Sequence, residues 1–478
     1  MKHTVIPRVL IILLGIAALV MGVPLVMAAV LGETGMIKAF AIPMAVILVP
    51  AALTAFFTRK QPLLFTPSDG FLLVFSAWLF TCLLGAAPYC ISGIVHVCDA
   101  VFESVGGFAT TGVTTIANIE ALPRSLLLWR SLTYWLGGMG IVMITVAFMP
   151  ILGVGGFQLL KAETSGPEKE KVTPRVTATA KFLWFLYCGL SVVLILLYRL
   201  GNMSWFDAVC HGLATIASGG ASTRNSGIAS FNSGFIDAVA TIFMLLAGLN
   251  FNLYYKLLRG KFRDVFTNTE GRAYILIFLV SAAVLTASLV PVYGGSALRY
   301  ASFQAASILS TTGSAIADYE AWPELAKAVL LCLMFAGGCS GSTAGGIKVI
   351  RHAVLFKQAG NELRRLVYPR GIFSIHLNRK VGRKDVVYGV AGFVFLYLMV
   401  VAVTALVTAA SGTDIFSSFS AALVITGNIG TGFGAAGPAR NYGAFPDHIK
   451  WLFSFVMIAG RLELWTVFVL FTPEYWRR

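Results

Sequence analysis

The chain has 478 residues, of which 57% are hydrophobic and only 12% are charged, and its mean hydropathy is +0.81. Soluble domains contain roughly 45–50% apolar and roughly 25% charged residues, so this composition excludes a water-soluble protein. A formal charge of +15 can indicate nucleic-acid binding, but here the basic residues are spread over short connections between apolar segments, and we expect no nucleic-acid partner. The seven cysteines form no Cys-x-x-Cys pair and predict neither a metal site nor a disulfide framework.

Ten apolar segments have the length of a membrane span, since a spanning helix needs about 20 mostly apolar residues. In chain order they cover residues 9–30, 37–57, 71–90, 126–148, 182–200, 235–253, 274–292, 326–347, 386–409 and 449–471. The first exceeds the roughly 7–15 apolar residues of a cleaved signal peptide, so we expect it to be retained as a helix. The sequence thus predicts an all-α, multi-pass membrane protein with ten transmembrane helices.

The distribution of charge predicts that both termini face the cytoplasm. In that orientation the inner connections carry 26 lysines and arginines against nine acidic residues, whereas the outer surface carries nine basic and eleven acidic residues. An excess of positive charge inside is the usual determinant of orientation. The basic inner connections, notably residues 348–384, also suit the docking of a peripheral subunit, although orientation and lipid contact explain the charge equally well.

Four connections on the expected outer side share one construction, a short apolar stretch followed by a turn rich in glycine and threonine. They cover residues 99–115, 207–223, 300–315 and 417–434. The third residue of each turn is a glycine, and these glycines are Gly112, Gly220, Gly313 and Gly430. Matching turns at similar spacing indicate a repeated unit of helix, half-helix, extended loop and helix.

These units predict one central pore surrounded by four pseudo-repeats. The expected boundaries are 1–66 for two extra N-terminal helices, then 67–160, 161–262, 263–360 and 361–478 for the four pore units, the third with an intramembrane loop. A half-helix of about ten residues is too short to cross the bilayer. Irregular backbone at membrane depth survives only where protein buries it or where it lines an aqueous cavity.

The turns have the chemistry of a cation site. The C-terminal end of each half-helix carries partial negative charge, and the turn after it offers backbone carbonyls and hydroxyls in place of the ion's water shell. The residues expected to bind the ion are Thr110, Thr111, Gly112, Ser218, Gly219, Gly220, Thr311, Thr312, Gly313, Asn428, Ile429 and Gly430. The second and fourth turns lack threonine at the positions of Thr110 and Thr111, which predicts looser selectivity than four identical turns would give.

A dense run of small residues interrupts the eighth apolar segment. Glycine costs a helix about 1 kcal/mol per residue relative to alanine, so the sequence predicts a loop within the membrane. This loop and the basic residue after it comprise Gly337, Gly338, Cys339, Ser340, Gly341, Ser342, Thr343, Ala344, Gly345, Gly346 and Lys348. Close helix packing through small residues is the alternative explanation.

Two further polar residues lie in apolar surroundings. Arg461 is the basic residue in the middle of the last span, where a charge is costly, so we expect it to face the interior and to have a partner. Snorkelling to the membrane boundary is the alternative. His211, within the second half-helix, has no neighbouring ligand pattern and is expected to pack or to form a hydrogen bond.

The four turns, the sequence Gly-Gly-Cys-Ser-Gly-Ser-Thr-Ala-Gly-Gly-Ile-Lys at 337–348, Asn-Phe-Asn at 250–252 and Gly-Arg-Leu-Glu at 460–463 resemble the Trk/Ktr/HKT superfamily of potassium transport proteins. Two extra N-terminal helices resemble TrkH/TrkG-like pore subunits more than Ktr. Sodium-preferring relatives tend to have serine at the position of Gly112. The resemblance implies potassium uptake through a selectivity filter, a gate formed by the loop at 337–346, and Arg461 as a positive barrier beneath the filter.

The resemblance also implies partners and a location. It predicts a homodimer that binds a cytoplasmic, nucleotide-binding, TrkA-like regulatory subunit and that lies among the lipids of the bacterial inner membrane. Potassium is the expected substrate, and no cofactor is expected in this chain. A secondary transporter coupled to protons or sodium is the alternative, although it would favour inverted repeats of five or more helices. A membrane enzyme is less favoured, because no acid pair or Ser-His or Cys-His arrangement lies in the spans.

Overall fold

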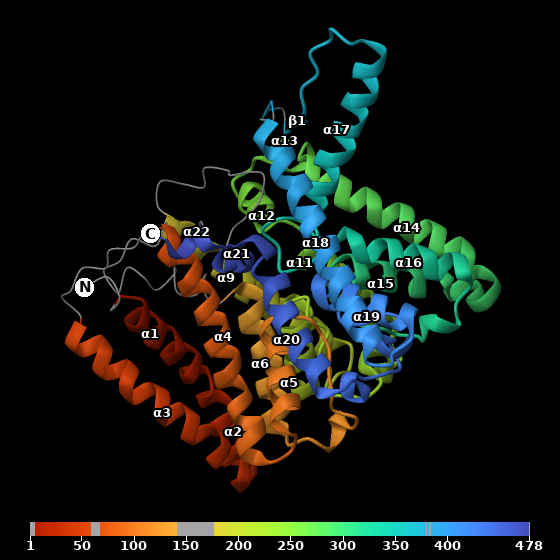
Figure 1. The fold of residues 1–478 in the computed structure, drawn as a ribbon. Coiled ribbons are helices and arrows are strands. Elements are labelled where there is room, and N and C mark those ends of the chain that lie inside the picture. The colour runs from red at the N-terminus through yellow and green to blue at the C-terminus, as the bar shows by residue number, and fades with distance from the viewer. Residues whose placement is uncertain (1–4, 59–66, 141–175, 379, 382–383, 478) are drawn as a thin grey trace.

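The computed structural model describes residues 5–58, 67–140, 176–378, 380–381 and 384–477. Nearly all regular structure among them is helical (Figure 1). The exception is a short antiparallel pair, β1 (His376–Leu377) and β2 (Lys380–Val381). The prediction of a predominantly helical membrane protein is confirmed, with this hairpin as a small addition.

The N-terminal part forms three helices, α1 (Val5–Val20), α2 (Gly22–Leu31) and α3 (Thr34–Thr58). Together, α1 and α2 make up the first apolar span, Ile6–Leu31. α2 ends at Gly32, whose left-handed conformation (φ 70°) lets its amide donate back to the last turn. α1 packs against α3 and α4 (Pro67–Ser92), so these helices lie together at one side of the molecule (Figure 1).

Four long helices of 25 to 27 residues each pack against a following half-helix of 12 or 13 residues. The long helices are α4, α9 (Val176–Leu200), α14 (Thr269–Tyr293) and α18 (Lys384–Ala410). The half-helices are α5 (Val97–Phe108), α10 (Trp205–Ile216), α15 (Ala297–Leu309) and α19 (Ile415–Gly427). Side chains cap two of the half-helices, since Ser204 accepts from the Asp207 amide and Asp414 accepts from the Ser417 amide.

Each half-helix leads through an extended segment to a second helix of 13 to 16 residues. These helices are α6 (Arg124–Met139), α11 (Gly234–Gly248), α16 (Glu324–Ala336) and α20 (Asp447–Arg461). α6, α16 and α20 follow Pro123, Pro323 and Pro446, whose missing N–H leaves no helical hydrogen bond unmade at that position. Each second helix contacts the next half-helix, in the pairs α6–α10, α11–α15, α16–α19 and α20–α5, so the arrangement closes into a ring.

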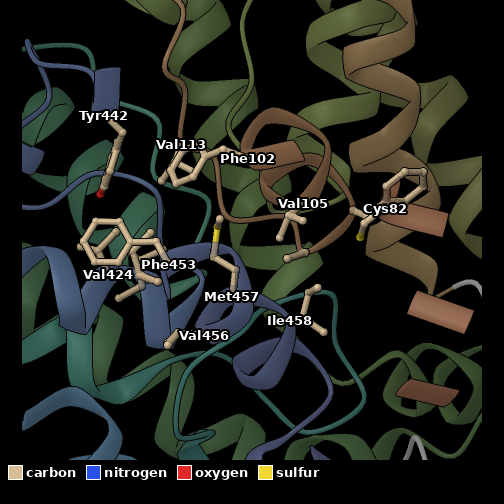
Figure 2. Packing of buried hydrophobic residues seen from close by; sticks show 14 of the residues in the cluster. Cys82, Phe102, Val105, Val113, Val424, Tyr442, Phe453, Val456, Met457 and Ile458 are labelled. Carbon is tan, nitrogen blue, oxygen red and sulfur yellow. The ribbon is translucent and has the colours of Figure 1, made fainter. Parts of the chain in front are cut away.

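The last contact of the ring, between α20 and α5, is built from buried apolar side chains. Figure 2 shows Phe102 and Val105 of α5 near Phe453 and Met457 of α20, all in one hydrophobic cluster. Val424 of α19 belongs to the same cluster. This packing places the first half-helix, α5, beside the last of the second helices, α20, although more than 300 residues separate them in the chain.

Six helices among the described residues are long and apolar enough to cross a membrane, or up to eight if each of two bent pairs is one span. The expected continuous helices over 235–253 and 449–471 are wrong. α11 and α12 (Phe251–Leu258) meet at 92°, and α20 and α21 (Leu464–Phe468) meet at 112°. Asn250 caps α12 through its side chain, and Glu463 has a positive φ of 61°, which a helix cannot accommodate.

Two other predicted spans are helical over part of their length in the described residues. The span 126–148 extends beyond Gly140 into residues outside the described part of the chain, as do the basic positions 161–175. The span 326–347 is helical only to Ala336. The count of ten spans therefore stays a prediction.

The remaining elements connect these helices. At one end of the bundle lie α12, α13 (Phe262–Phe266) and α17 (Val349–Val367), and α17 projects away from the rest (Figure 1). The chain closes with η8 (Val469–Phe471) and α22 (Pro473–Trp476). Short 3-10 turns occupy the connections: η2 (Ile119–Ala121), η3 (Gly227–Phe231), η4 (Gly294–Ser296), η5 (Tyr319–Ala321), η6 (Gly434–Ala436) and η7 (Tyr442–Ala444).

Candidate functional site

The four predicted turns share one backbone conformation despite their different side chains. Each begins with a left-handed residue, and these residues, Thr110, Ser218, Thr311 and Asn428, have φ between 52° and 55°. Two positions later each turn reaches a glycine with φ between 61° and 103°, namely Gly112, Gly220, Gly313 or Gly430. Glycine adopts positive φ without steric cost, and asparagine tolerates it, whereas Thr110, Ser218 and Thr311 adopt it against their preference. Such strained positions cluster at functional sites.

Hydrogen bonds close the four half-helices in the same way. The amide of the middle turn residue donates to the carbonyl five residues earlier, at 2.8 to 3.0 Å, in the pairs Thr111–Gly106, Gly219–Ala214, Thr312–Ser307 and Ile429–Val424. The left-handed residue before it donates to the carbonyl three residues earlier. This is the Schellman arrangement of a helix C-terminus, with a side chain at the position usually held by glycine. Those side chains are therefore available for other contacts.

The four glycines approach the neighbouring turns so closely that no side chain fits. A Cβ at each would lie within 3.0 Å of the carbonyl oxygen of the middle residue in the next turn. The pairs are Gly112 with Gly219, Gly220 with Thr312, Gly313 with Ile429, and Gly430 with Thr111. Each turn thus contacts the next one in the chain, and the fourth contacts the first, so the four turns form a closed ring. The structure brings together all twelve residues predicted to bind an ion.

This ring can coordinate a cation. Backbone carbonyls from four chain segments converge at the C-terminal ends of four half-helices, where the helix dipoles place partial negative charge. Carbonyl oxygens can replace the water shell of a monovalent cation. No group of three or more His, Cys, Asp or Glu side chains in the described ranges could hold a metal ion.

The tertiary structure explains why two turns depart from the threonine pattern. At Gly219 the ring of Tyr134 occupies the place where a side chain would lie. In the fourth turn the Asn428 amide donates to Thr111 Oγ1 at 2.9 Å and to the Met457 carbonyl at 3.1 Å. The asparagine therefore ties the fourth turn to the first and to α20.

The predicted intramembrane loop lies directly against the turns. After α16 ends at Ala336, the chain is irregular until α17 begins at Val349. Thr343 Oγ1 lies 2.6 Å from Ser218 Oγ, and the Gly345 amide donates to Thr311 Oγ1 at 2.7 Å. The left-handed residues of the second and third turns thus use their hydroxyls to hold the loop.

Other contacts anchor the loop to the break between α11 and α12. The Cys339 amide donates to the Gly248 carbonyl at 2.8 Å, and the Phe251 amide donates to the Gly341 carbonyl at 3.0 Å. The Ser340 amide donates to Glu270 Oε1 at 2.6 Å. This specific set of polar contacts favours an ordered loop over the alternative of plain helix packing.

Arg461 lies next to this loop and donates hydrogen bonds to three backbone carbonyls. Nη1 donates to the Thr343 carbonyl at 2.6 Å. Nη2 donates to the carbonyls of Gly137 and Gly138, at 2.7 and 3.1 Å, where α6 ends. The guanidinium therefore bridges the last helix, the loop and the end of α6, and these directions do not match snorkelling to a membrane boundary.

A second charged contact beneath the loop escaped sequence analysis. Glu463 forms an ion pair with Arg351, and both side chains are largely buried. Arg351 also donates to the Ile347 carbonyl at 3.2 Å, and Lys348 donates to the Ala344 carbonyl within the loop. Glu463 follows Arg461 by two positions inside an apolar span, and that position was the available signal.

His211 forms the hydrogen bonds that its position predicts. Its Nδ1 lies 2.9 Å from the Asp207 carbonyl, and its Nε2 lies 2.9 Å from Ser222 Oγ. Sequence analysis also missed a buried ion pair, Glu103 with Arg130, that lies behind the first turn.

A short recurring sequence was missed as well. Asn-Ile-Glu-Ala-Leu-Pro at 118–123, Asp-Tyr-Glu-Ala-Trp-Pro at 318–323 and Asn-Tyr-Gly-Ala-Phe-Pro at 441–446 lead into α6, α16 and α20. Its members brace neighbouring turns, because Tyr319 donates to the Gly432 carbonyl at 2.7 Å and the Tyr442 amide donates to the Thr114 carbonyl at 2.8 Å. A search for repeats at the spacing of the turns would have found it.

The chain is similar to known proteins over most or all of its length. The family model described as TrkH, cation transport protein, matches residues 36–478. The Trk system potassium uptake protein TrkH of Escherichia coli (strain K12) is 39% identical over 427 residues, 88% of each chain. TrkG of the same organism is 36% identical over 429 residues, again 88% of each. The crystal structure of the potassium transporter TrkH from Vibrio parahaemolyticus matches over 100% of both chains with a TM-score of 0.88 and 34% identity.

Proposed function

Because this chain belongs to the TrkH family of cation transport proteins, we propose that it takes up potassium ions through a channel-like pore between its four glycine turns. Similar proteins of Escherichia coli are named potassium uptake proteins of the Trk system. The observation that carries the proposal is the closed ring in which each glycine meets a carbonyl of the next turn. In this proposal four pseudo-repeats surround one pore, and the twelve turn residues form its selectivity filter.

The physical basis of selection is the spacing of the carbonyls. A dehydrated ion is stabilised when the oxygens that replace its water lie at the distances it prefers, and a smaller ion gains less from the same ring. Backbone packing holds the ring, since every glycine is in contact with the adjacent turn. Because the second and fourth turns lack the threonine pair, we expect moderate discrimination against sodium.

We assign the gate to the loop of residues 337–346 together with Lys348 and Arg461. The loop contacts the second and third turns through Thr343 and Gly345, and Arg461 places a positive charge beside it. A fixed cation next to the ion path raises the energy of a passing cation, by an amount that depends on the local dielectric. Conduction then requires the loop and the guanidinium to move away from the path.

The surroundings follow from the same proposal. The chain is a multi-pass membrane protein, and we place it in the bacterial inner membrane with both termini in the cytoplasm. Exposed Arg364, Arg365 and Arg370 at the end of α17 support a docking surface for a nucleotide-binding, TrkA-like regulatory subunit. A homodimer completes the proposed assembly.

Flux through the purified chain in lipid vesicles tests the proposal. Vesicles loaded with potassium chloride and diluted into a potassium-free medium should accumulate labelled rubidium, because potassium efflux sets an inside-negative potential. Accumulation should need neither a proton nor a sodium gradient. Protein-free vesicles are the control. Absence of rubidium flux would contradict potassium transport, whereas flux that requires an imposed proton or sodium gradient would support the coupled transporter instead.

Growth provides a second test. Expression of the chain should restore growth of a potassium-uptake-deficient bacterium in low-potassium medium. Growth that is restored only by added sodium would contradict the assignment of potassium as the substrate.

A further inference from the structure

A buried network joins the segments that leave the first and second turns. Glu103 on α5 and Arg130 on α6 form an ion pair with Oε2 and Nε 3.2 Å apart, and their side chains are 0% and 3% exposed. The other oxygen of Glu103 accepts hydrogen bonds from Thr114 Oγ1 and from the Thr115 amide, both at 2.6 Å. These threonines follow Gly112 by two and three positions, so Glu103 holds the first turn from behind.

Arg130 extends the network to the second turn. Its Nη1 donates to the Ser222 carbonyl at 3.1 Å, two residues beyond Gly220. The hydroxyl of Ser222 is held in turn by His211 Nε2 at 2.9 Å. Within this network, Arg130 is therefore the described side chain that contacts both Glu103, which holds the first turn, and the backbone that follows the second turn.

The other units of the ring lack this charged arrangement. Glu103 lies nine positions before the glycine of the first turn, and the residues at the same distance before the glycines of the other three turns are His211, Gln304 and Ala421. Arg130 lies seven positions after Pro123, which precedes α6. The residues at the same distance after the prolines that precede α16 and α20 are Leu330 and Phe453. The fold thus accepts apolar residues at these places. A buried ion pair is also weak support for stability, because desolvation of both charges offsets their attraction.

The second turn has a specific need for such support. Its sequence Ser218-Gly219-Gly220 contains two adjacent glycines, which restrict the backbone less than the threonines of the first turn do. Carbonyl spacing in the ring depends on where the flanking segments are held. A link from Glu103 through Arg130 to Ser222 fixes the first turn relative to the second.

From this geometry we propose that Arg130 and Glu103 are positioning residues that set the discrimination between potassium and sodium by fixing the first and second turns. The role rests on the proposed function, since it presumes that ions pass between the turns. Neither side chain contacts the ion path in this role. Their effect is transmitted through the Thr115 amide and the Ser222 carbonyl.

The variant E103Q/R130M tests the role without leaving an unpaired buried charge. Glutamine keeps an oxygen that can accept from Thr114 and Thr115, and methionine fills much of the volume of arginine but cannot donate to Ser222. The matched control is D99N/K450M. Lys450 and Asp99 form a similar pair at 2.7 Å between α20 and α5, with side chains 7% and 18% exposed. No described contact of that pair reaches a turn or the segment after it.

The measurement is the sodium-to-potassium permeability ratio from reversal potentials in reconstituted membranes, with the unfolding temperature in detergent recorded alongside. We expect the ratio of E103Q/R130M to rise about tenfold, equivalent to about 1.4 kcal/mol, and that of D99N/K450M to match the unmodified chain. An unchanged ratio in folded E103Q/R130M, or an equal rise in the control, would overturn the positioning role. Absence of rubidium or potassium flux through the unmodified chain would instead overturn the proposed function, and this role with it.

Discussion

Arg461 donates a hydrogen bond of 2.6 Å to the backbone carbonyl of Thr343, and Thr343 in turn lies 2.6 Å from the hydroxyl of Ser218 in the second turn. The end of α20 is thereby connected to the second turn through the loop that follows α16. The same guanidinium donates hydrogen bonds to the carbonyls of Gly137 and Gly138 at the end of α6. In the proposed gate, Arg461 combines a mechanical contact with an electrostatic barrier.

The first prediction is that Arg461→Gln raises potassium flux or removes its gating. Glutamine keeps polarity and much of the volume but removes the charge and at least one of the three carbonyl contacts. An effective dielectric near 20 gives about 4 kcal/mol for two charges about 4 Å apart, and about 1.4 kcal/mol already changes a rate about tenfold. Rubidium uptake per folded molecule is the measurement.

Arg199→Gln is the matched control for that variant. Arg199 likewise donates to a backbone carbonyl, that of Met203 at 3.3 Å, but it lies near the end of α9 and away from the loop. We expect its uptake to equal that of the unmodified chain. Unchanged uptake per folded Arg461→Gln molecule would reject the pore-facing role, whatever happens to the yield.

The second prediction concerns the place where the loop packs against the end of α19. A Cβ on Gly345 would lie within 3.0 Å of the Gly427 carbonyl at the end of α19. Gly345→Ala should therefore push the loop away from the turns and weaken the bond from its amide to Thr311, which raises flux in the absence of a regulatory subunit. Gly360→Ala on α17 is the control, because no atom lies within 4 Å of the added carbon there. Equal flux for both variants, each folded, would count against the gate.

Deletion within the loop gives a coarser test of the same idea. Removing several residues between Gly338 and Gly345 should raise flux and reduce its dependence on a regulatory subunit, because the obstruction is gone. A folded deletion protein with unaltered flux would favour a packing role for the small residues.

The third prediction is that Gly112→Ser weakens selection against sodium. The added Cβ would lie 2.7 Å from the Gly219 carbonyl, and φ at this position is +80°, so the ring must widen or twist. Strain of this kind costs about 1–3 kcal/mol, enough to alter carbonyl spacing. The potassium-to-sodium permeability ratio should fall about tenfold, as about 1.4 kcal/mol implies.

Gly294→Ser separates backbone strain from the effect on the ring. Gly294 also has positive φ, +54°, but no atom lies within 4 Å of an added Cβ. Its permeability ratio should stay at that of the unmodified chain. A Gly112→Ser protein with an unchanged ratio would remove Gly112 from the selective site.

The fourth prediction addresses the ion pair beneath the loop. Glu463→Gln leaves the Arg351 guanidinium, which is 4% exposed, without its carboxylate, and loss of one partner of a buried pair costs about 3–5 kcal/mol. Glu362→Gln breaks an exposed i,i+3 pair with Arg365, where about 0.3–0.5 kcal/mol is at stake. Thermal unfolding in detergent should therefore show a much larger fall in midpoint for Glu463→Gln. Equal shifts would show that the Arg351 pair does not stabilise the fold.

The sequence alone determined the membrane class, the order of long and short helices, the four turns and the irregular loop. The length of an apolar run and the density of glycine are local properties of the sequence. An apolar run of about 20 residues matches the thickness of the bilayer and predicts a helix, and dense glycine predicts a break, whatever the segment packs against. Position in the chain also identified Arg461, because a charge within an apolar span needs a partner wherever it folds.

Tertiary structure decided which surfaces meet. The bends at Asn250 and Glu463 were invisible to hydropathy, since each lies inside an apolar run and depends on a side-chain cap or on one positive φ. Arg461 donates to the backbone carbonyls of Thr343 and Gly137, and because every residue possesses a carbonyl, no sequence pattern could select these two. The ring exists because α20 packs against α5 and closes it. Contacts between distant segments, such as Thr111 and Gly430, which are 319 positions apart, set the carbonyl spacing within it.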